Sequence, residues 1–149
     1  MKEKTKFNII KYTSKLHRKS QMYVNEQVKN LDITGGQVPF IKILCENGEI
    51  IQNEFCRFLD IDKSTVAKMM VKLESEGYII KTNNKTDNRS TYIKPTDKSY
   101  KIYPKLKRIE QNWFGEITKD FTDIEKLIFF DLIKKATINA GSFFYRCDN

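Results

Sequence analysis

The chain has 149 residues, with 27 Lys and Arg against 19 Asp and Glu, and a formal net charge of +8. This length fits one domain, and 40% hydrophobic with 31% charged residues excludes a wholly disordered chain. No apolar run approaches the roughly 20 residues that cross a bilayer, and the basic start lacks a signal-peptide core, so we expect a cytoplasmic protein with no membrane partner.

The sequence also lacks the residue patterns that catalysis requires. It has one histidine, His17, and its cysteines, Cys45, Cys56 and Cys147, have neither zinc-site spacing nor a disulfide pattern. It contains no glycine-rich phosphate-binding loop. We therefore predict that the protein is not an enzyme and needs no cofactor or metal. The basic isoelectric point, near 9.3, favours a polyanionic partner.

The chain begins with a predicted helix, because its first thirty residues lack Gly and Pro and space their apolar residues helically. Seven basic residues among the first nineteen are either a solvated helix face or the flank of an anion-binding surface. Thr34 and Gln37 then have the spacing of a capping box, which predicts a helix that ends at Gly48.

A short extended segment at 49–51 and a short helix at 53–59 come next. Asp62 is placed to cap a further helix, 63–76, which Gly77 ends. The inner face of that helix carries Val66, Met70 and Leu73. Two helices joined by a tight turn, the second amphipathic, predict a helix-turn-helix.

Segments 78–82 and 90–94 are rich in β-branched and aromatic residues, and we predict that they form a hairpin. Thr96 is placed to cap a long helix. A second capping box, Thr122 with Glu125, opens a last helix that we expect Gly141 to close. That last helix is apolar around more than one narrow stripe, which predicts burial against another chain.

A helix-turn-helix followed by a basic hairpin, with long helices at both ends, resembles the MarR family of winged-helix transcription regulators. Motifs in the family's order and spacing carry this resemblance: Ile33-Thr34 with Gln37, Phe55-Cys56 with Leu59 and Ile61, Ser64-Thr65-Val66, Leu73-Glu74, Gly77-Tyr78-Ile79 with Lys81, Asp87-Asn88-Arg89-Ser90, and Thr96.

Some positions depart from the family's pattern. Ile51 stands where a Ser or Thr cap is common, and Cys56 replaces a usual Ala. Lys81 replaces a common Arg, which keeps the charge but loses bidentate phosphate recognition. Pro95 and Ser99 replace Leu and Gly before the fifth helix, so the geometry between wing and helix is the part most exposed to change.

The second helix of a helix-turn-helix enters the major groove, and Lys63, Ser64, Thr65, Lys68 and Lys72 have the chemistry to contact bases or phosphates there. The alternative is a solvated lysine face on which the two hydroxyls only complete the cap. Met69 would contact a thymine methyl group or fold back on the core.

In the hairpin, Lys85 and Arg89 can reach phosphates or the minor groove. Asp87 shares a face with Arg89 if the segment is extended. The resemblance implies that Arg89 enters the minor groove while Asp87 holds it. The alternative is an exposed ion pair of little energetic weight.

We therefore expect a mostly α fold with a small β-hairpin wing: a winged helix-turn-helix at 34–96, flanked by long dimerisation helices in 1–33 and 97–149. The expected function is that of a homodimeric transcriptional regulator, most simply a repressor, that binds an inverted-repeat operator in double-stranded DNA and responds to a small-molecule effector. His17, Tyr12 and Tyr23 are candidates to line an effector pocket, and the alternative for each is simple core or surface packing. The alternatives are a winged-helix module for a protein partner, a thiol-based redox sensor, and a ligand carrier or enzyme.

Overall fold

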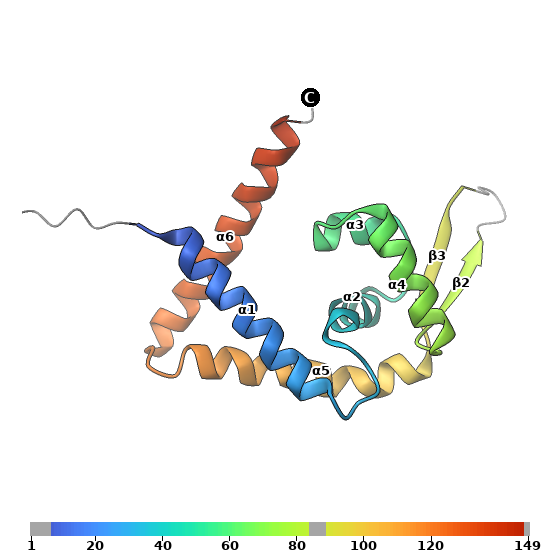
Figure 1. The fold of residues 1–149 in the computed structure, drawn as a ribbon, viewed down its shortest axis with the longest axis horizontal. Coiled ribbons are helices and arrows are strands. Elements are labelled where there is room, and N and C mark those ends of the chain that lie inside the picture. Colours follow the sequence, from blue (N-terminus) through green and yellow to red (C-terminus); the bar gives the residue numbers. More distant parts are fainter. Residues whose placement is uncertain (1–6, 84–88, 148–149) are drawn as a thin grey trace, which may run out of the picture.

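The computed structural model describes residues 7–83 and 89–147, of which 145–147 are described by their backbone alone. Within these ranges the elements run α1 (Ile9–Val28), the 3-10 turn η1 (Gly35–Gln37), α2 (Val38–Asn47), β1 (Ile50–Ile51), α3 (Glu54–Leu59), α4 (Lys63–Ser75), β2 (Ile79–Asn83), β3 (Thr91–Pro95), α5 (Asp97–Ile117) and α6 (Asp123–Cys147). The helix α5 passes beneath a lobe built from α2, α3, α4 and the hairpin, and α6 turns back from its far end (Figure 1).

The lobe is organised around a small antiparallel sheet in the order β1-β3-β2. Ile93 of the central strand pairs with Ile50 on one side and with Lys81 on the other. Ile93, Phe55, Leu44 and Met70 are all 0% exposed, so α2, α3 and α4 share one core with the sheet. This shared core fixes the position of α4 relative to the hairpin.

The predicted helix boundaries in the middle of the chain are confirmed by their caps. The backbone N–H of Thr34 donates to Oε1 of Gln37 over 2.8 Å, and both halves of the capping box are present. Asp62 caps α4 by accepting from the backbone N–H of Thr65. Gly48 and Gly77 follow α2 and α4 with a φ of 79°, the left-handed conformation that glycine adopts without steric cost.

The start of α5 is attached to the end of α4 through successive carbonyl groups. The hydroxyl of Thr96 donates to the carbonyl of Gly77 over 2.6 Å, and the hydroxyl of buried Ser99 donates to that of Tyr78 over 2.6 Å. The ammonium of Lys98 donates to the carbonyl of Glu76 over 2.7 Å. Thr96 thus occupies the cap position but makes no side-chain cap bond, contrary to our prediction, because its hydroxyl is engaged by Gly77.

The last helix is longer than the sequence predicts. The expected stop at Gly141 is wrong, since α6 continues to Cys147. A glycine ends a helix by adopting a positive φ, and Gly141 keeps a helical conformation. The capping box at the other end of α6 is confirmed, with the N–H of Thr122 donating to Oε2 of Glu125 over 2.8 Å.

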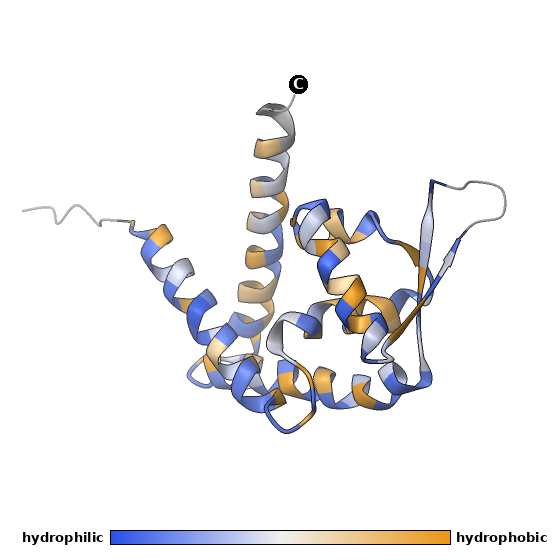
Figure 2. Ribbon diagram, turned by 45° about the vertical axis from the view of Figure 1, so that its right-hand side comes forward, coloured by the Kyte–Doolittle hydropathy of each residue, from blue (hydrophilic) through white to orange (hydrophobic). Residues whose placement is uncertain are grey.

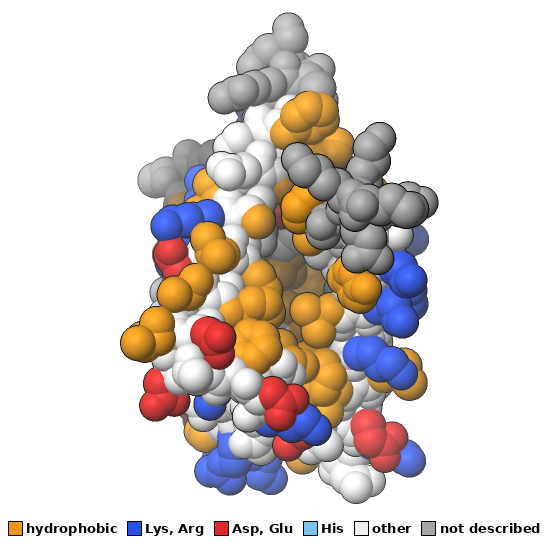
Figure 3. Space-filling model, turned by 90° about the vertical axis from the view of Figure 1, so that its left-hand side faces the viewer, with side chains coloured by type: hydrophobic (Ala, Val, Ile, Leu, Met, Phe, Trp, Pro, Cys, Tyr) orange, Lys and Arg blue, Asp and Glu red, His pale blue; other side chains and the backbone are white. Residues whose placement is uncertain are grey.

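The helix α6 exposes large apolar side chains along its length (Figure 2). They are Ile124, Leu127, Ile128, Phe130, Leu132, Ile133, Ile138, Phe143 and Phe144. A groove of about 780 Å³ between α5 and α6, lined by Trp113, Phe114 and Phe130 among others, continues this surface. Hydrophobic side chains gather around a hollow on this face of the molecule (Figure 3). Among the described residues, none of the helices combines the length and apolar character needed to span a membrane.

Candidate nucleic-acid interface

Three lysines of α4 carry positive charge that no described acidic side chain neutralises. Lys63, Lys68 and Lys72 are exposed, and none of them forms an ion pair with any residue that the structure describes. Other lysines of the same lobe are paired: Lys42 with Glu110, Lys81 with Glu74, and Lys94 with Glu49. Because Lys68 and Lys72 are four residues apart on one helix, they lie on the same side of it.

The inner face of α4 holds the helix in place. Val66, Met70 and Leu73 are at most 1% exposed, as the sequence predicts. Met69, which the sequence left open, is half-buried and packs against the core beside Gly36. A firmly packed helix therefore presents its lysine side to solvent.

The first turn of α4 contains a compact hydrogen-bond cluster around one carboxylate. Asp62 accepts from the hydroxyl of Ser64 over 2.6 Å and from both the N–H and the hydroxyl of Thr65 over 2.8 Å each. The Ser64 bond, then those of Thr65, hold the pKa of Asp62 well below its usual range. Ser64 and Thr65 thus complete the cap while remaining exposed.

The hairpin of β2 and β3 projects beside α4 (Figure 1). Arg89 is exposed at the described end of its loop, whereas Lys85 and Asp87 lie outside the described residues. Lys81, which sequence reasoning treated only as a possible phosphate ligand, pairs with Glu74 of α4 over 3.3 Å. This ion pair joins strand β2 to α4, a contact that no short-range sequence pattern indicates.

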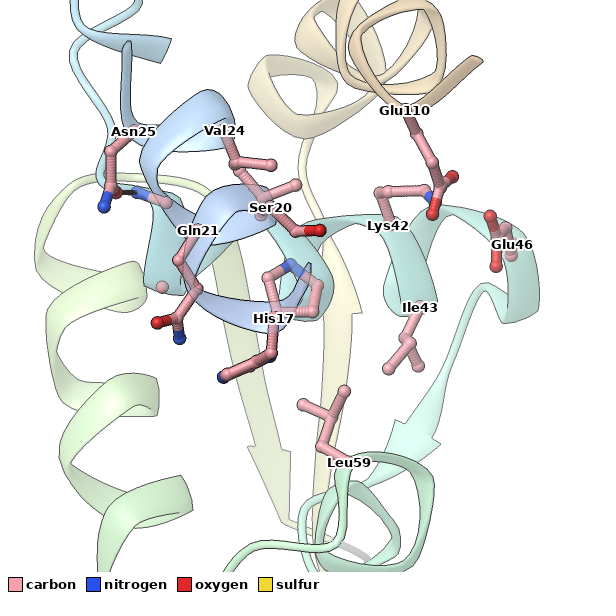
Figure 4. Close-up of a pocket in the computed structure, with 14 residues that line it drawn as sticks. His17, Ser20, Gln21, Val24, Asn25, Lys42, Ile43, Glu46, Leu59 and Glu110 are labelled. Atoms are coloured by element: carbon pink, nitrogen blue, oxygen red, sulfur yellow. Dashed lines mark hydrogen bonds and ion pairs between the residues drawn. The ribbon is translucent and has the colours of Figure 1, made fainter. Parts of the chain in front are cut away.

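A pocket of about 740 Å³ lies where α1, α2 and α5 meet the lobe. Figure 4 shows His17 and Ser20 of α1 on one side and Lys42 and Ile43 of α2 on the other. His17, one of the candidates for an effector pocket, is among the residues that line it. Tyr12 and Tyr23 are not among its lining residues, and Tyr23 instead stacks on Trp113 with ring centroids 4.6 Å apart.

Polar side chains that the sequence did not single out also line this pocket. Lys42 and Glu110 form an ion pair between α2 and α5, and Glu46 and Asn25 contribute further polar groups. Only the fold brings these residues together, since they come from distant parts of the sequence.

The two cysteines of the lobe, Cys45 and Cys56, are half-buried thiols beside the core. Burial, assisted by the neighbouring charge of Glu46, raises the pKa of Cys45 to about 11. A thiol must ionise to react with oxidants, so Cys45 is poorly suited to redox sensing. The side chain of Cys147 lies outside the described residues.

The succession α3, turn, α4 and β-hairpin defines a winged helix-turn-helix protein. The family model for the MarR family matches residues 33–91. The chain is 32% identical over 102 residues to the uncharacterized HTH-type transcriptional regulator YybA of Bacillus subtilis, an alignment that covers 68% of each chain. The chain belongs to the MarR family and is a transcriptional regulator of that family.

Solved structures agree with this assignment. A MarR protein from Peptoclostridium difficile matches 98% of this chain and 95% of its own, with a TM-score of 0.89 and 29% identity. A MarR family transcriptional regulator from Listeria monocytogenes, solved in complex with 26mer DNA, matches 94% of each chain with a TM-score of 0.85 and 28% identity. The predicted fold class is therefore confirmed.

Proposed function

We propose that this regulator binds double-stranded DNA through α4 and the hairpin. The observation that carries the proposal is a set of exposed lysines on α4, Lys63, Lys68 and Lys72, none of which pairs with an acidic side chain in the part of the chain that the structure describes. Phosphates attract such charges and release counterions on binding. The complex of the Listeria relative with DNA supports the same reading.

The DNA-contacting residues in this proposal come from two elements. The helix α4 supplies Lys63, Ser64, Thr65, Lys68, Met69 and Lys72, with Met69 contributing least because it is half-buried. The hairpin supplies Lys85, Asp87 and Arg89. Residues 34–96 form the DNA-binding region, and 1–33 with 97–149 form the dimerisation region.

The homodimer is proposed on the apolar surface of α6 and the groove beside it. A large contiguous apolar face is costly in water, and the helix exposes one along most of its length. A second copy would cover it and set the spacing of two α4 helices. Two such helices related by a twofold axis match an inverted-repeat operator.

Regulation is proposed to work through the pocket lined by α1, α2 and α5. A small-molecule effector there would contact α1 and the lobe together, so it would change the position of one relative to the other. We expect the dimer to repress by binding its operator, and the effector to change that binding.

Salt-dependent DNA binding tests this function. A labelled random-sequence duplex is titrated with wild type, Lys68→Ala, Lys72→Ala and the matched control Lys101→Ala, an exposed lysine on α5. We expect Lys68→Ala and Lys72→Ala each to reduce the slope of log affinity against log salt by about one per contact in each half-site. Wild type that fails to bind, or equal effects of all three variants, would refute DNA binding through α4.

A further inference from the structure

The hydroxyl protons at the start of α4 both point to the same carboxylate. The hydroxyl of Ser64 donates to Oδ1 of Asp62 and that of Thr65 donates to Oδ2. An ionised carboxylate only accepts, and the low pKa of Asp62 keeps it ionised at any physiological pH. A hydroxyl has one proton and two lone pairs, so Ser64 and Thr65 present only lone pairs to a ligand.

We propose that Ser64 and Thr65 are specificity-determining residues that select bases carrying an exocyclic amino group, adenine or cytosine, over the keto bases guanine and thymine. This inference rests on the DNA binding proposed above. In the major groove N6 of adenine and N4 of cytosine donate, whereas O6 of guanine and O4 of thymine accept. A hydroxyl that can only accept pairs with the amino groups and is repelled by the carbonyl oxygens.

Because their protons are engaged by Asp62, these hydroxyls are also unsuited to contact phosphate. Phosphate oxygens are acceptors, so a contact would require a hydroxyl proton to turn away from Asp62. That would break a hydrogen bond to a charged group, the stronger class. Lys63, Lys68 and Lys72 of the same helix are donors and supply the phosphate contacts instead.

The carboxylate of Asp62 therefore sets the hydrogen-bond polarity of the reading surface without touching DNA itself. Asp62→Asn changes that polarity at one hydroxyl only. In wild type, Oδ1 of Asp62 accepts from the Thr65 N–H and from the Ser64 hydroxyl. In the variant, the amide oxygen of Asn should take the place of Oδ1, because both partners there are donors, and the helix cap is kept. The amide NH₂ takes the place of Oδ2 and donates to the Thr65 hydroxyl oxygen. The proton of the Thr65 hydroxyl is then free to be donated to a ligand.

Selection from a random duplex library, followed by sequencing, measures base preference for wild type, Thr65→Val, Ser64→Ala and Asp62→Asn. Thr65→Val keeps the shape of the side chain and removes the hydroxyl, and thermal unfolding checks that each variant folds. We expect wild type to prefer adenine or cytosine over keto bases, roughly three- to tenfold, at one position for each hydroxyl. Thr65→Val should abolish the preference at one of these positions and Ser64→Ala at the other.

Asp62→Asn provides the decisive comparison. The Thr65-dependent position should lose its amino preference or turn to guanine or thymine, while the Ser64-dependent position stays unchanged as an internal control. Because every base pair carries one amino and one keto group in the major groove, the preference appears as adenine or cytosine on one strand with thymine or guanine opposite. A hydroxyl-dependent position that instead separates A·T from G·C pairs or purines from pyrimidines, no change of preference in Thr65→Val, or an unchanged Thr65-dependent position in Asp62→Asn would overturn the proposal. Wild type that selects no DNA would instead refute the proposed function, and this inference with it.

Discussion

Gln37 should make a large contribution to the stability of the lobe, and Gln37→Met tests this. The side chain is 0% exposed. Its oxygen accepts from the N–H of Thr34 over 2.8 Å, and its Nε2 donates to Oε2 of Glu76 over 2.5 Å. Methionine fills similar space but offers neither group, so both partners lose their hydrogen bonds without a cavity being created.

The expected loss follows from the two bonds. Removing the cap contact costs about 1 kcal/mol. Removing a hydrogen bond to a carboxylate costs about 1.5–3 kcal/mol, less what water recovers at half-buried Glu76. We therefore expect Gln37→Met to lower the free energy of unfolding by about 2–4 kcal/mol.

Urea unfolding, followed by circular dichroism at one fixed protein concentration, measures this loss. Fixing the concentration matters because association contributes to the apparent stability of a dimer. The control is Glu76→Gln, which keeps an acceptor oxygen for Gln37 and should cost about 1 kcal/mol or less. A Gln37→Met protein within about 0.5 kcal/mol of wild type would refute the reasoning, since that is the range of an ordinary surface change.

Three further outcomes are expected. Arg89→Ala should leave thermal stability nearly unchanged while weakening DNA binding by about 1–3 kcal/mol, the scale of one groove contact; an unfolded variant would mean that the arginine is structural. Sedimentation should find a dimer at micromolar concentration, and Leu127→Asp with Phe130→Asp should dissociate it, because both residues lie on the exposed apolar face of α6; a folded wild-type monomer would contradict this. With a pKa of about 11, Cys45 should react with iodoacetamide, in a background where both Cys56 and Cys147 are replaced by Ser, at a rate that still rises tenfold per pH unit at pH 9, and a plateau by pH 9 would contradict the burial argument.

The sequence was most informative where partners lie within one turn of each other. Asp62 with Thr65 and Thr122 with Glu125 are three residues apart, and the structure confirms both as helix caps. Such contacts depend on local backbone geometry alone, so spacing suffices to predict them. The buried stripe of α4 was predictable for the same reason.

The sequence was least informative where contacts join distant segments. Gln37 reaches Glu76 across 39 positions, and Lys42 reaches Glu110 across 68. No local pattern distinguishes these lysine and glutamate side chains from the exposed ones nearby. The sequence therefore predicted a lysine-rich helix at the candidate interface. It could not predict which lysines form ion pairs with distant acidic residues and which do not, because those pairs depend on the fold.

The two errors at helix ends have a common origin. We predicted from local sequence that Thr96 caps the start of one helix and that Gly141 ends another. In the structure Thr96 donates to Gly77 instead, and Gly141 stays helical within α6. Thr96 still stands at the start of α5 without making the cap bond, and Gly141 ends no helix, so a residue type suited to a local role does not take it when its surroundings favour another arrangement.

Hydrogen bonds join the start of α5 to the carbonyls of Glu76, Gly77 and Tyr78, directly after α4. A movement of α5 is therefore transmitted to α4. The 21 residues of α5 span roughly 30 Å at about 1.5 Å per residue. A tilt of about 5° at the end next to α6 would displace the other end by ~3 Å over that length. This is close to the rise of one base pair, about 3.4 Å. In the proposed DNA complex, a tilt small enough for side-chain packing to absorb would thus put α4 out of register with its half-site.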